Sequence, residues 1–213
     1  MIVSHKHRFI FIHIYKVAGT SLRRALAQAS ASWWELMRSR LTGNRSTDEP
    51  HLRARQIRER LTPEVYDTFY KFAFVRNPWD WQVSLYHYAL DNPTHFQHEL
   101  MKQLGSFEGY LRWRVEEEMR TQKDFVTDET GRLIVDYIGR LETLSDDFSH
   151  VLRTLGLKQV RLPQINRSSH KPYQDYYTDT GRELVAQAFG EDIEMFGYDF
   201  DGIRPNAGPV VPR

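Results

Sequence analysis

With 213 residues, the chain has the length of one ordinary domain, and its 40% apolar content is enough for a full core. The sequence contains no cysteine, which excludes disulfides and thiolate metal ligands. The net charge of +1 conceals an asymmetry, because residues 1–60 carry twelve Lys or Arg against four Asp or Glu, and residues 61–213 carry seventeen against twenty-four. This basic N-terminal third favours an anionic ligand, although a solvated basic helix face explains it equally well.

The organisation of the chain is expected to be simple. We predict a single domain over residues 1–202 and a flexible tail over residues 203–213, where proline and glycine are frequent. The first apolar run, within residues 8–14, is too short to span a membrane, and no cleavage site of small residues follows it. The sequence therefore predicts a cytoplasmic protein.

Two buried strands, each followed by a helix, are predicted in the first part of the chain. Residues 8–14 and 69–75 are almost continuously apolar, which is typical of strands buried on both faces. Apolar residues at helical spacing predict a helix over residues 20–29, and residues 51–61 predict a basic helix. Pro78 then opens a helix with apolar residues along one face.

Helix start and stop signals continue toward the C-terminus. Ser106 is expected to cap one helix, Ser145 to open another that ends at Gly156, and Thr180 to begin a capping box. Residues 127–139 predict a turn that leads into a short strand. Strands that alternate with helices indicate an α/β fold with a mainly parallel sheet covered on both faces.

The first buried strand leads directly into groups that suit an anion. After a parallel strand, the loop and the next helix N-terminus lie at the carboxyl edge of the sheet, where ligands bind in open α/β folds. Lys16 supplies a cation, Gly19 allows close backbone approach, and Thr20 and Ser21 supply hydroxyls. The helix start adds unpaired N–H groups and the positive end of its dipole, so the segment predicts an anion site. The alternative is a helix cap beside a surface lysine.

The order of these residues differs from that of a Walker A loop. That pattern places lysine after its second glycine, in G-x-x-x-x-G-K-[ST], whereas Lys16 precedes Gly19 here. The sequence therefore argues against a GTPase, an ordinary ATPase or a transferase that resembles nucleotide kinases.

A second cation follows the second buried strand. Arg76 stands at the carboxyl end of that strand, and Ser84 lies about two turns into the next helix. An arginine in this place suits planar, bidentate recognition of a phosphate. For this corner alone, a salt-bridged arginine and a helix serine are an alternative, but two corners suited to anions in one sheet are harder to obtain by chance.

These two corners carry a family resemblance. The segments HIYKVAGTS and VRNPWDWQVSLY resemble the two donor-binding motifs of PAPS-dependent sulfotransferases, most closely the carbohydrate branch with the heparan 2-O and chondroitin enzymes and compact bacterial members. The similarity continues through HLRARQIRERL, VDYIGRLETL and LPQINRSSHKPY. It implies a P-loop-like three-layer α/β fold that moves a sulfuryl group from PAPS to an acceptor hydroxyl, in a saccharide or glycoconjugate, and releases 3′,5′-ADP without a metal.

The sequence departs from the family pattern at two positions. Tyr15 stands where the family usually has proline, and Trp81 stands where it often has arginine. Neither position supplies the anion contacts described above. We therefore interpret both as changes in loop shape and helix packing.

The resemblance also implies roles for individual residues. The first motif would cradle the 5′-phosphosulfate through Lys16, Val17, Ala18, Gly19, Thr20 and Ser21. Lys16 would stabilise the bridging oxygen as 3′,5′-ADP departs. The 3′-phosphate would be bound by Arg76 and Ser84, with a later segment closing over the nucleotide through Arg167, Ser168, Ser169 and Lys171.

A general base is needed to take the proton of the acceptor hydroxyl. His51 opens the basic helix and resembles a histidine that the family has there, and a histidine near its usual pKa suits this work at neutral pH. The alternative is a residue that makes a local contact at the helix start. His13 is expected to be a satisfied core histidine, and His95 and His98 to be loop residues rather than metal ligands.

Two interpretations from other functional classes stay open. One is a protein that binds PAPS or another nucleotide without transfer, and the other is a basic module that binds nucleic acid. Against the second, no nucleic-acid motif is present and the basic residues are not interleaved with aromatic residues that look exposed. We therefore expect no nucleic-acid partner, while the arginines of residues 53–60 fit either an anionic acceptor or a solvated helix face.

Overall fold

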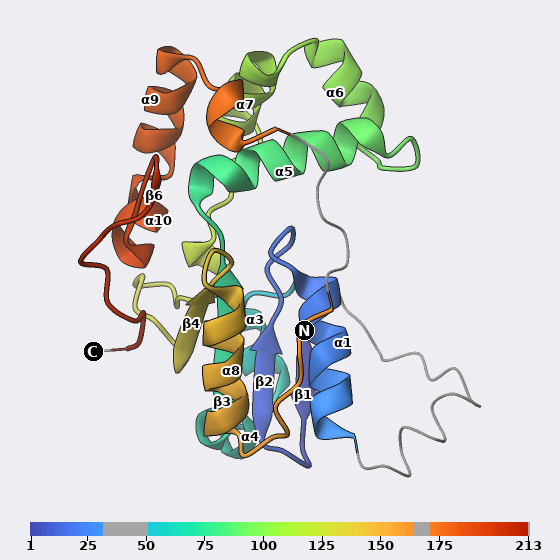
Figure 1. The fold of residues 1–213 in the computed structure, drawn as a ribbon, viewed down its shortest axis with the longest axis vertical. Coiled ribbons are helices and arrows are strands. Elements are labelled where there is room, and N and C mark those ends of the chain that lie inside the picture. The colour runs from blue at the N-terminus through green and yellow to red at the C-terminus, as the bar shows by residue number, and fades with distance from the viewer. Residues whose placement is uncertain (32–50, 164–170, 213) are drawn as a thin grey trace. The chain divides into compact units, whose positions relative to one another are not determined.

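The computed structural model describes residues 1–31, 51–163 and 171–212, so the loop expected at residues 39–50 lies outside the described residues. The chain divides into two compact units. The first comprises Met1–Val75, Asp124–Asn166 and Pro209–Arg213, and the second comprises Arg76–Lys123 and Arg167–Gly208. The first unit holds the main sheet, and the second is built mostly from helices (Figure 1).

Four strands form the sheet of the first unit: β1 (Ile2–Ser4), β2 (Phe9–Ile12), β3 (Tyr70–Val75) and β4 (Tyr137–Arg140). Their order is β1-β2-β3-β4, with β1 antiparallel to β2 and the other three strands parallel. The predicted class, an α/β fold with a mainly parallel central sheet flanked by helices, is confirmed. The short strand β1 was not predicted.

The parallel strands are buried because their side chains are apolar on both faces. Every residue of β2 is at most 1% exposed, and Phe11 stacks on Phe72 of β3 with ring centroids 5.3 Å apart. Ile12 pairs with Ala73, and Val75 pairs with Arg140. The three parallel strands therefore end at the same edge of the sheet, and the segments that follow them begin there.

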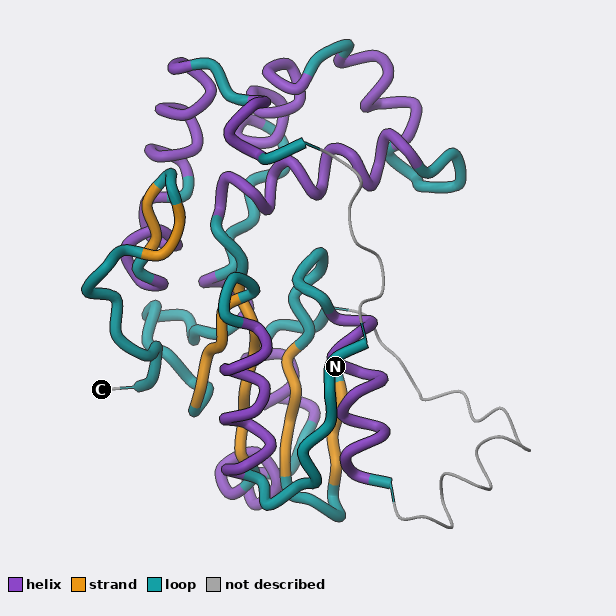
Figure 2. Tube along the Cα trace, in the orientation of Figure 1, coloured by secondary structure: helices purple, strands orange, loops and turns teal. Residues whose placement is uncertain are grey.

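Four helices pack around this sheet: α1 (Gly19–Ser30), α3 (Ala54–Arg60), α4 (Pro63–Thr68) and α8 (Leu144–Thr154). In the views of Figures 1 and 2, α8 lies in front of the sheet, and α3 and α4 lie behind it. The predicted apolar face of α1 is confirmed, because Leu22, Ala25, Leu26 and Ala29 are all buried.

The second unit contains the helices α5 (Pro78–Asp91), α6 (His98–Leu104), α7 (Phe107–Glu116), η2 (Tyr173–Tyr176), α9 (Asp179–Ala188) and α10 (Gly190–Phe196). The short helix η1 (Lys123–Phe125) marks a boundary between segments of the two units. The hairpin of β5 (Tyr198–Asp199) and β6 (Gly202–Ile203) was not predicted. Helix α5 packs against α6, α7, η2 and α9.

The predicted helix starts are confirmed at α7 and wrong at α9 and α8. Ser106 caps α7, because its Oγ accepts a hydrogen bond from the N–H of Gly109 at 3.0 Å. At α9 the cap is Thr178, whose Oγ1 accepts from the N–H of Gly181 at 3.1 Å, so Thr180 lies inside the helix. Both threonines suit a cap, and the helix uses the one that also brings an aspartate into its first turn. Helix α8 begins at Leu144, one residue before Ser145.

Part of the C-terminal segment lies against β4. The N–H of Ile138 donates a hydrogen bond to the carbonyl of Val210 at 3.0 Å, and Val210 is buried. Over the described ranges of the chain, no helix combines the length and the apolar character that crossing a bilayer requires. The single domain and the flexible tail stay predictions.

Candidate functional site

The loop that follows β2 has a strained backbone. Its φ angle is +61° at Lys16 and +49° at Ala18, whereas Val17 between them keeps a negative φ. Residues other than glycine rarely adopt positive φ, and strain of this kind concentrates at functional sites. When the sign of φ alternates, successive N–H groups turn toward one side and form a concave site for an anion.

Helix α1 begins at the end of this loop. Ala18 is its N-cap residue, and the N–H of Leu22 makes the first helical hydrogen bond to the carbonyl of Ala18 at 3.0 Å. The first turn contains no acidic side chain, and Ala18 has no side-chain acceptor to cap the helix. Neither the cap residue nor the first turn of α1 therefore offsets the positive end of the helix dipole, which suits an anion.

The predicted residues of this loop differ in exposure. The side chain of Val17 is buried, at 1% exposed, so this residue can offer only its backbone to a ligand, while Lys16 is half-buried. Thr20 is exposed, and Ser21 is buried within the first turn of α1. Backbone N–H groups, one lysine and one accessible hydroxyl thus lie along a short stretch of chain.

Gly19 is required by the packing of the loop against His13. A Cβ atom at Gly19 would lie 1.6 Å from Nε2 of His13, far inside any allowed contact. The imidazole therefore occupies the space that a side chain at this position would need. Any larger residue has to displace the ring of His13.

His51 is held beside the same strand by a hydrogen bond. Its Nδ1 lies 3.1 Å from the carbonyl oxygen of His13. Because a carbonyl oxygen only accepts, Nδ1 of His51 carries the proton, and the neutral ring keeps its lone pair on Nε2. Burial lowers the pKa of His51 below its ordinary value, although the hydrogen bond to His13 acts in the opposite direction. The ring is therefore a neutral base at neutral pH.

His13 is a neutral ring in contact with His51. Burial, reinforced by the neighbouring His51, lowers the pKa of His13 to about 3, and the two ring centroids are 4.6 Å apart. Within the described parts of the chain, Nδ1 of His13 has no hydrogen-bond partner. The prediction of a satisfied core histidine is wrong in this respect, because Nδ1 of this ring, which packs against Gly19 and His51, is buried without a hydrogen bond.

Tyr15 forms an aromatic wall beside His51. The edge of its ring lies against His51, with centroids 5.5 Å apart, and against Phe125 at 5.6 Å. Phe125 is buried and packs against the ring of Tyr15. The departure from proline at this position therefore places a large side chain next to the predicted base.

Helix α3 follows His51 and presents a basic surface. Arg53 lies 4.0 Å from Asp124, whereas Arg58 and Arg60 are exposed in the last turn. Basic side chains favour this end of a helix because they face the negative end of its dipole. A solvated helix face is thus sufficient to explain Arg58 and Arg60.

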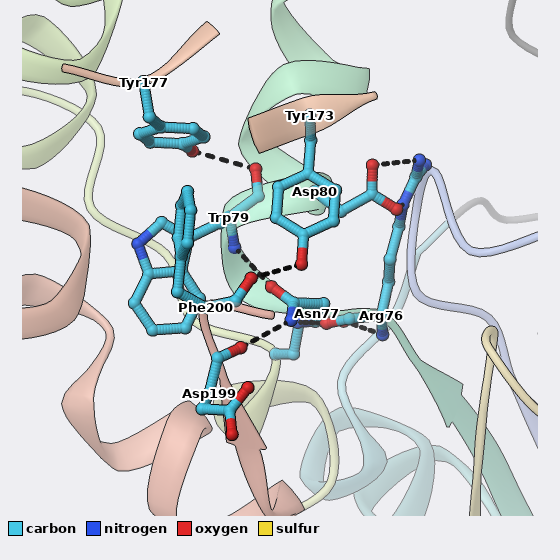
Figure 3. Close-up of polar contacts among 9 residues, drawn as sticks. Arg76, Asn77, Trp79, Asp80, Tyr173, Tyr177, Asp199 and Phe200 are labelled. Atoms are coloured by element: carbon cyan, nitrogen blue, oxygen red, sulfur yellow. Dashed lines mark hydrogen bonds and ion pairs between the residues drawn. The ribbon is translucent and has the colours of Figure 1, made fainter. Parts of the chain in front are cut away.

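In the second unit, Arg76 forms a bidentate ion pair with Asp80 (Figure 3). The distances are 2.6 Å from Nε to Oδ2 and 2.8 Å from Nη2 to Oδ1, and both side chains are largely buried. The pair fixes the plane of the guanidinium. From the sequence, a phosphate-binding arginine and a salt-bridged arginine were alternatives here. Asp80 was not predicted as the partner, although the i,i+4 spacing is typical of such pairs.

Asn77, the residue after Arg76, is also held by hydrogen bonds of its side chain. Oδ1 of Asn77 accepts the N–H of Trp79 at 3.0 Å and caps α5, while Nδ2 donates to the carbonyl of Asp199 at 2.8 Å. The hydroxyl of Tyr177 donates to the carbonyl of Trp79 at 2.8 Å (Figure 3). The start of α5 is therefore tied to the β5–β6 hairpin and to the segment before α9.

Comparison with known proteins assigns the chain to a family. The profile described as the sulfotransferase family matches residues 1–199, which include both strand-to-helix corners. The chain belongs to the sulfotransferase family. It is also similar to an uncharacterized protein of Archaeoglobus fulgidus, with 27% identity over 121 residues that make up 55% of this chain and 93% of that protein. The general resemblance to sulfotransferases is therefore confirmed, and with it a transferase that moves sulfuryl groups.

The other residues predicted to bind the donor of this sulfotransferase lie in α5 and in the segment before η2. Ser84 is buried in α5, and Lys171 is exposed before η2. Arg167, Ser168 and Ser169 lie outside the described residues. Their roles in binding a donor stay predictions.

Three histidines of the second unit, His87, His95 and His98, make local contacts. Nδ1 of His87 lies 3.7 Å from Asp91, and Nδ1 of His98 lies 3.2 Å from the carbonyl of Ala89. Nδ1 of His95 accepts a backbone N–H at 3.2 Å. In the part of the chain that the structure describes, no group of three or more His, Asp or Glu side chains is arranged to hold a metal ion.

Proposed function

We propose that this sulfotransferase moves the sulfuryl group of PAPS to a hydroxyl of a saccharide or glycoconjugate and releases 3′,5′-ADP. The observation that carries the proposal is the loop after β2, where two residues with positive φ lead into a helix whose own first turn contains no acidic residue. Such a backbone suits an anion with several oxygens. Family membership and the resemblance of both motifs to PAPS-binding motifs support the choice of donor.

In this proposal the donor is bound by the two motifs. The phosphosulfate is held by the N–H groups of residues 18–21 and by Lys16, and the 3′-phosphate by Arg76 and Ser84. The support for a donor shared by the two motifs is their joint resemblance to the donor-binding motifs of the family. Arg167, Ser168, Ser169 and Lys171 complete the proposed donor site.

The reaction needs one proton acceptor and one group to stabilise the leaving oxygen. The acceptor oxygen attacks sulfur while the bond from sulfur to the bridging phosphate oxygen breaks, and the electron pair stays on that oxygen. Nε2 of His51 takes the hydroxyl proton, which the tautomer set by His13 allows. Lys16 stabilises the negative charge on the departing 3′,5′-ADP. These groups suffice without a metal ion.

The acceptor class and the cellular location are proposals of the same kind. The resemblance to the carbohydrate branch supports a saccharide acceptor, and the aromatic ring of Tyr15 beside His51 offers a surface on which a sugar ring can stack. We propose that the protein acts in the cytoplasm.

Calorimetry and a transfer assay test the proposal. The wild type should bind 3′,5′-ADP at micromolar concentration and much more tightly than 5′-AMP or ATP, and Arg76→Ala should remove this preference. Sulfate from labelled PAPS should then appear on members of a panel of neutral and acidic saccharides. Equal binding of 3′,5′-ADP and 5′-AMP would overturn the choice of donor. Binding without transfer to any hydroxyl compound would instead support a PAPS-binding protein without transfer activity.

A further inference from the structure

A buried glutamine holds the backbone of Arg76 in the second unit. Oε1 of Gln122 accepts the N–H of Arg76 at 2.9 Å, and Nε2 of the same side chain donates to the carbonyl of Arg76 at 2.7 Å. These partners fix the orientation of the amide, because its oxygen must face a donor and its nitrogen must face an acceptor. Gln122 is 0% exposed. One side chain thus satisfies both backbone groups of one residue.

The glutamine takes the place of a strand neighbour. The hydrogen bond from the N–H of Leu141 to the carbonyl of Val75 lies within the first unit, where the sheet ends. Arg76 comes directly after it, and buried backbone groups at such a position need partners. Gln122 supplies them where the ladder stops, so both backbone groups of Arg76 are hydrogen-bonded between the end of β3 and the start of α5.

The glutamine is itself held in position. Asp192, which is 0% exposed, accepts the N–H of Gln122 with Oδ2 and the N–H of Lys123 with Oδ1, each at 2.8 Å. Arg114 ties down the preceding residues, because its Nη2 donates to the carbonyl of Arg120 at 3.2 Å. The segment that carries Gln122 is therefore fixed from two sides before it contacts Arg76.

We propose that Gln122 is a positioning residue that orients Arg76 for recognition of the 3′-phosphate of the donor, with Asp192 holding Gln122 in place. Gln122 fixes the backbone of Arg76, Asn77 fixes the residue after it, and Asp80 fixes the guanidinium. Side-chain and backbone freedom that is removed in advance does not have to be lost on binding, which favours affinity for the group that Arg76 contacts. The inference rests on the proposed role of Arg76 in donor binding.

The chain offers a matched control in Gln82. This second glutamine of the same unit is also 0% exposed, and its Oε1 accepts the hydroxyl of Tyr110 at 3.0 Å. In the described structure, Gln82 makes no hydrogen bond with Arg76. Gln82→Leu and Gln122→Leu therefore each bury a leucine in place of a glutamine, and only the second removes the bonds to Arg76.

The experiment measures selectivity as the ratio of the Kd for 5′-AMP to the Kd for 3′,5′-ADP. Loss of a buried hydrogen-bond pair corresponds to about a tenfold change or more, so Gln122→Leu should lower the ratio at least tenfold, and Gln82→Leu should leave it within about twofold. Gln122→Glu keeps the acceptor for the N–H of Arg76 but loses the donor to its carbonyl, and should lower the ratio by an intermediate factor. Hydrogen exchange of the Arg76 amide should accelerate in Gln122→Leu, which removes its acceptor, and not in Gln82→Leu.

The outcomes separate this inference from the proposed function. A wild type without preference for 3′,5′-ADP would overturn the proposed donor before any variant is made. If the wild type shows the preference and Arg76→Ala removes it, but both Gln122 variants keep it, the positioning role is overturned. Unchanged exchange of the Arg76 amide in Gln122→Leu would overturn it as well, whatever the ligand data. Should Gln122→Leu fail to fold, the ratio of the two Kd values is compared between the wild type and the isosteric Gln122→Glu, which loses only the bond to the carbonyl of Arg76.

Discussion

The segments after β2 and after β3 are both strand-to-helix corners, yet they are held in opposite ways. The first has positive φ at Lys16 and Ala18 and a helix start without a side-chain cap. The second has a capped helix, a bidentate ion pair at Arg76 and a backbone bonded by Gln122. The first corner has a strained backbone and a helix start without a side-chain cap, whereas in the second corner neighbouring side chains bond the backbone and the guanidinium of Arg76. We infer that the first corner serves the chemical step and the second serves recognition.

The largest effect is expected at His51, beside the first corner. His51→Ala should lower kcat for sulfuryl transfer by about 10²–10⁴-fold, because it removes the proposed general base. Burial lowers the pKa of His51, so the wild-type rate should stay at its plateau as pH falls past 6.5 and decline only below the lowered pKa. A pH–rate profile measures this decline at low pH, the acid limb of the profile, which His51→Ala should lack. The exposed His150 serves as the control, and an unchanged limb in His51→Ala would contradict the assignment.

Lys16 is the next test of the first corner. Lys16→Met keeps a long apolar stem but removes the charge that stabilises the leaving oxygen, so kcat should fall about 10²–10³-fold. The KM for PAPS should change much less, because the interaction is strongest in the transition state. Steady-state kinetics with Lys102→Met, an exposed lysine of α6, provide the comparison. A variant that raised only KM would indicate that Lys16 binds the donor without contributing to the chemical step.

The two corners also differ in how far the sequence predicts them. Strands β2 and β3 follow from apolar runs, α1 follows from its helical spacing, and the loop after β2 follows from the local order of Lys16, Gly19 and Ser21. The second corner depends on Gln122, which lies 46 positions from Arg76, and no local pattern indicates that contact. Likewise, the packing of His13 against Gly19 depends on the course of the backbone. Local spacing therefore predicts which groups are present, while distant partners decide how they are held.

Asp80→Asn tests the claim that the second corner is satisfied in advance. The change leaves the largely buried guanidinium of Arg76 without its counter-charge, which should lower the free energy of unfolding by about 3 kcal/mol. Glu108→Gln removes the equivalent i,i+4 partner of Arg112 on an exposed face of the same unit, and should cost less than about 1 kcal/mol. Urea unfolding of the two variants measures the difference. Equal losses would mean that burial adds nothing to the pair at Arg76.

The pH dependence of stability tests the burial of His13. Its folded pKa is about 3, below the unfolded value of 6.5, so the unfolded chain binds a proton first as pH falls. The stability that the neutral ring contributes is therefore complete above pH 6.5 and is lost as pH falls toward 3. Between pH 7 and pH 5 the loss should reach roughly 2 kcal/mol. His13→Gln should flatten this slope in urea unfolding at several pH values, and an unchanged slope would show that other groups cause it.

The smallest effect is expected from relieving strain at Ala18. Glycine adopts positive φ without steric cost, but it also gives the unfolded chain more freedom, so Ala18→Gly should raise the free energy of unfolding by at most about 1 kcal/mol. Leu22→Ala, in the buried face of the same helix, should instead lower it by about 2–5 kcal/mol and calibrates the measurement. If Ala18→Gly is stabilising while kcat is kept, the strain at Ala18 is a consequence of the loop shape alone. If it is stabilising and kcat falls, the strained conformation itself holds the N–H groups in the orientation that the transition state needs.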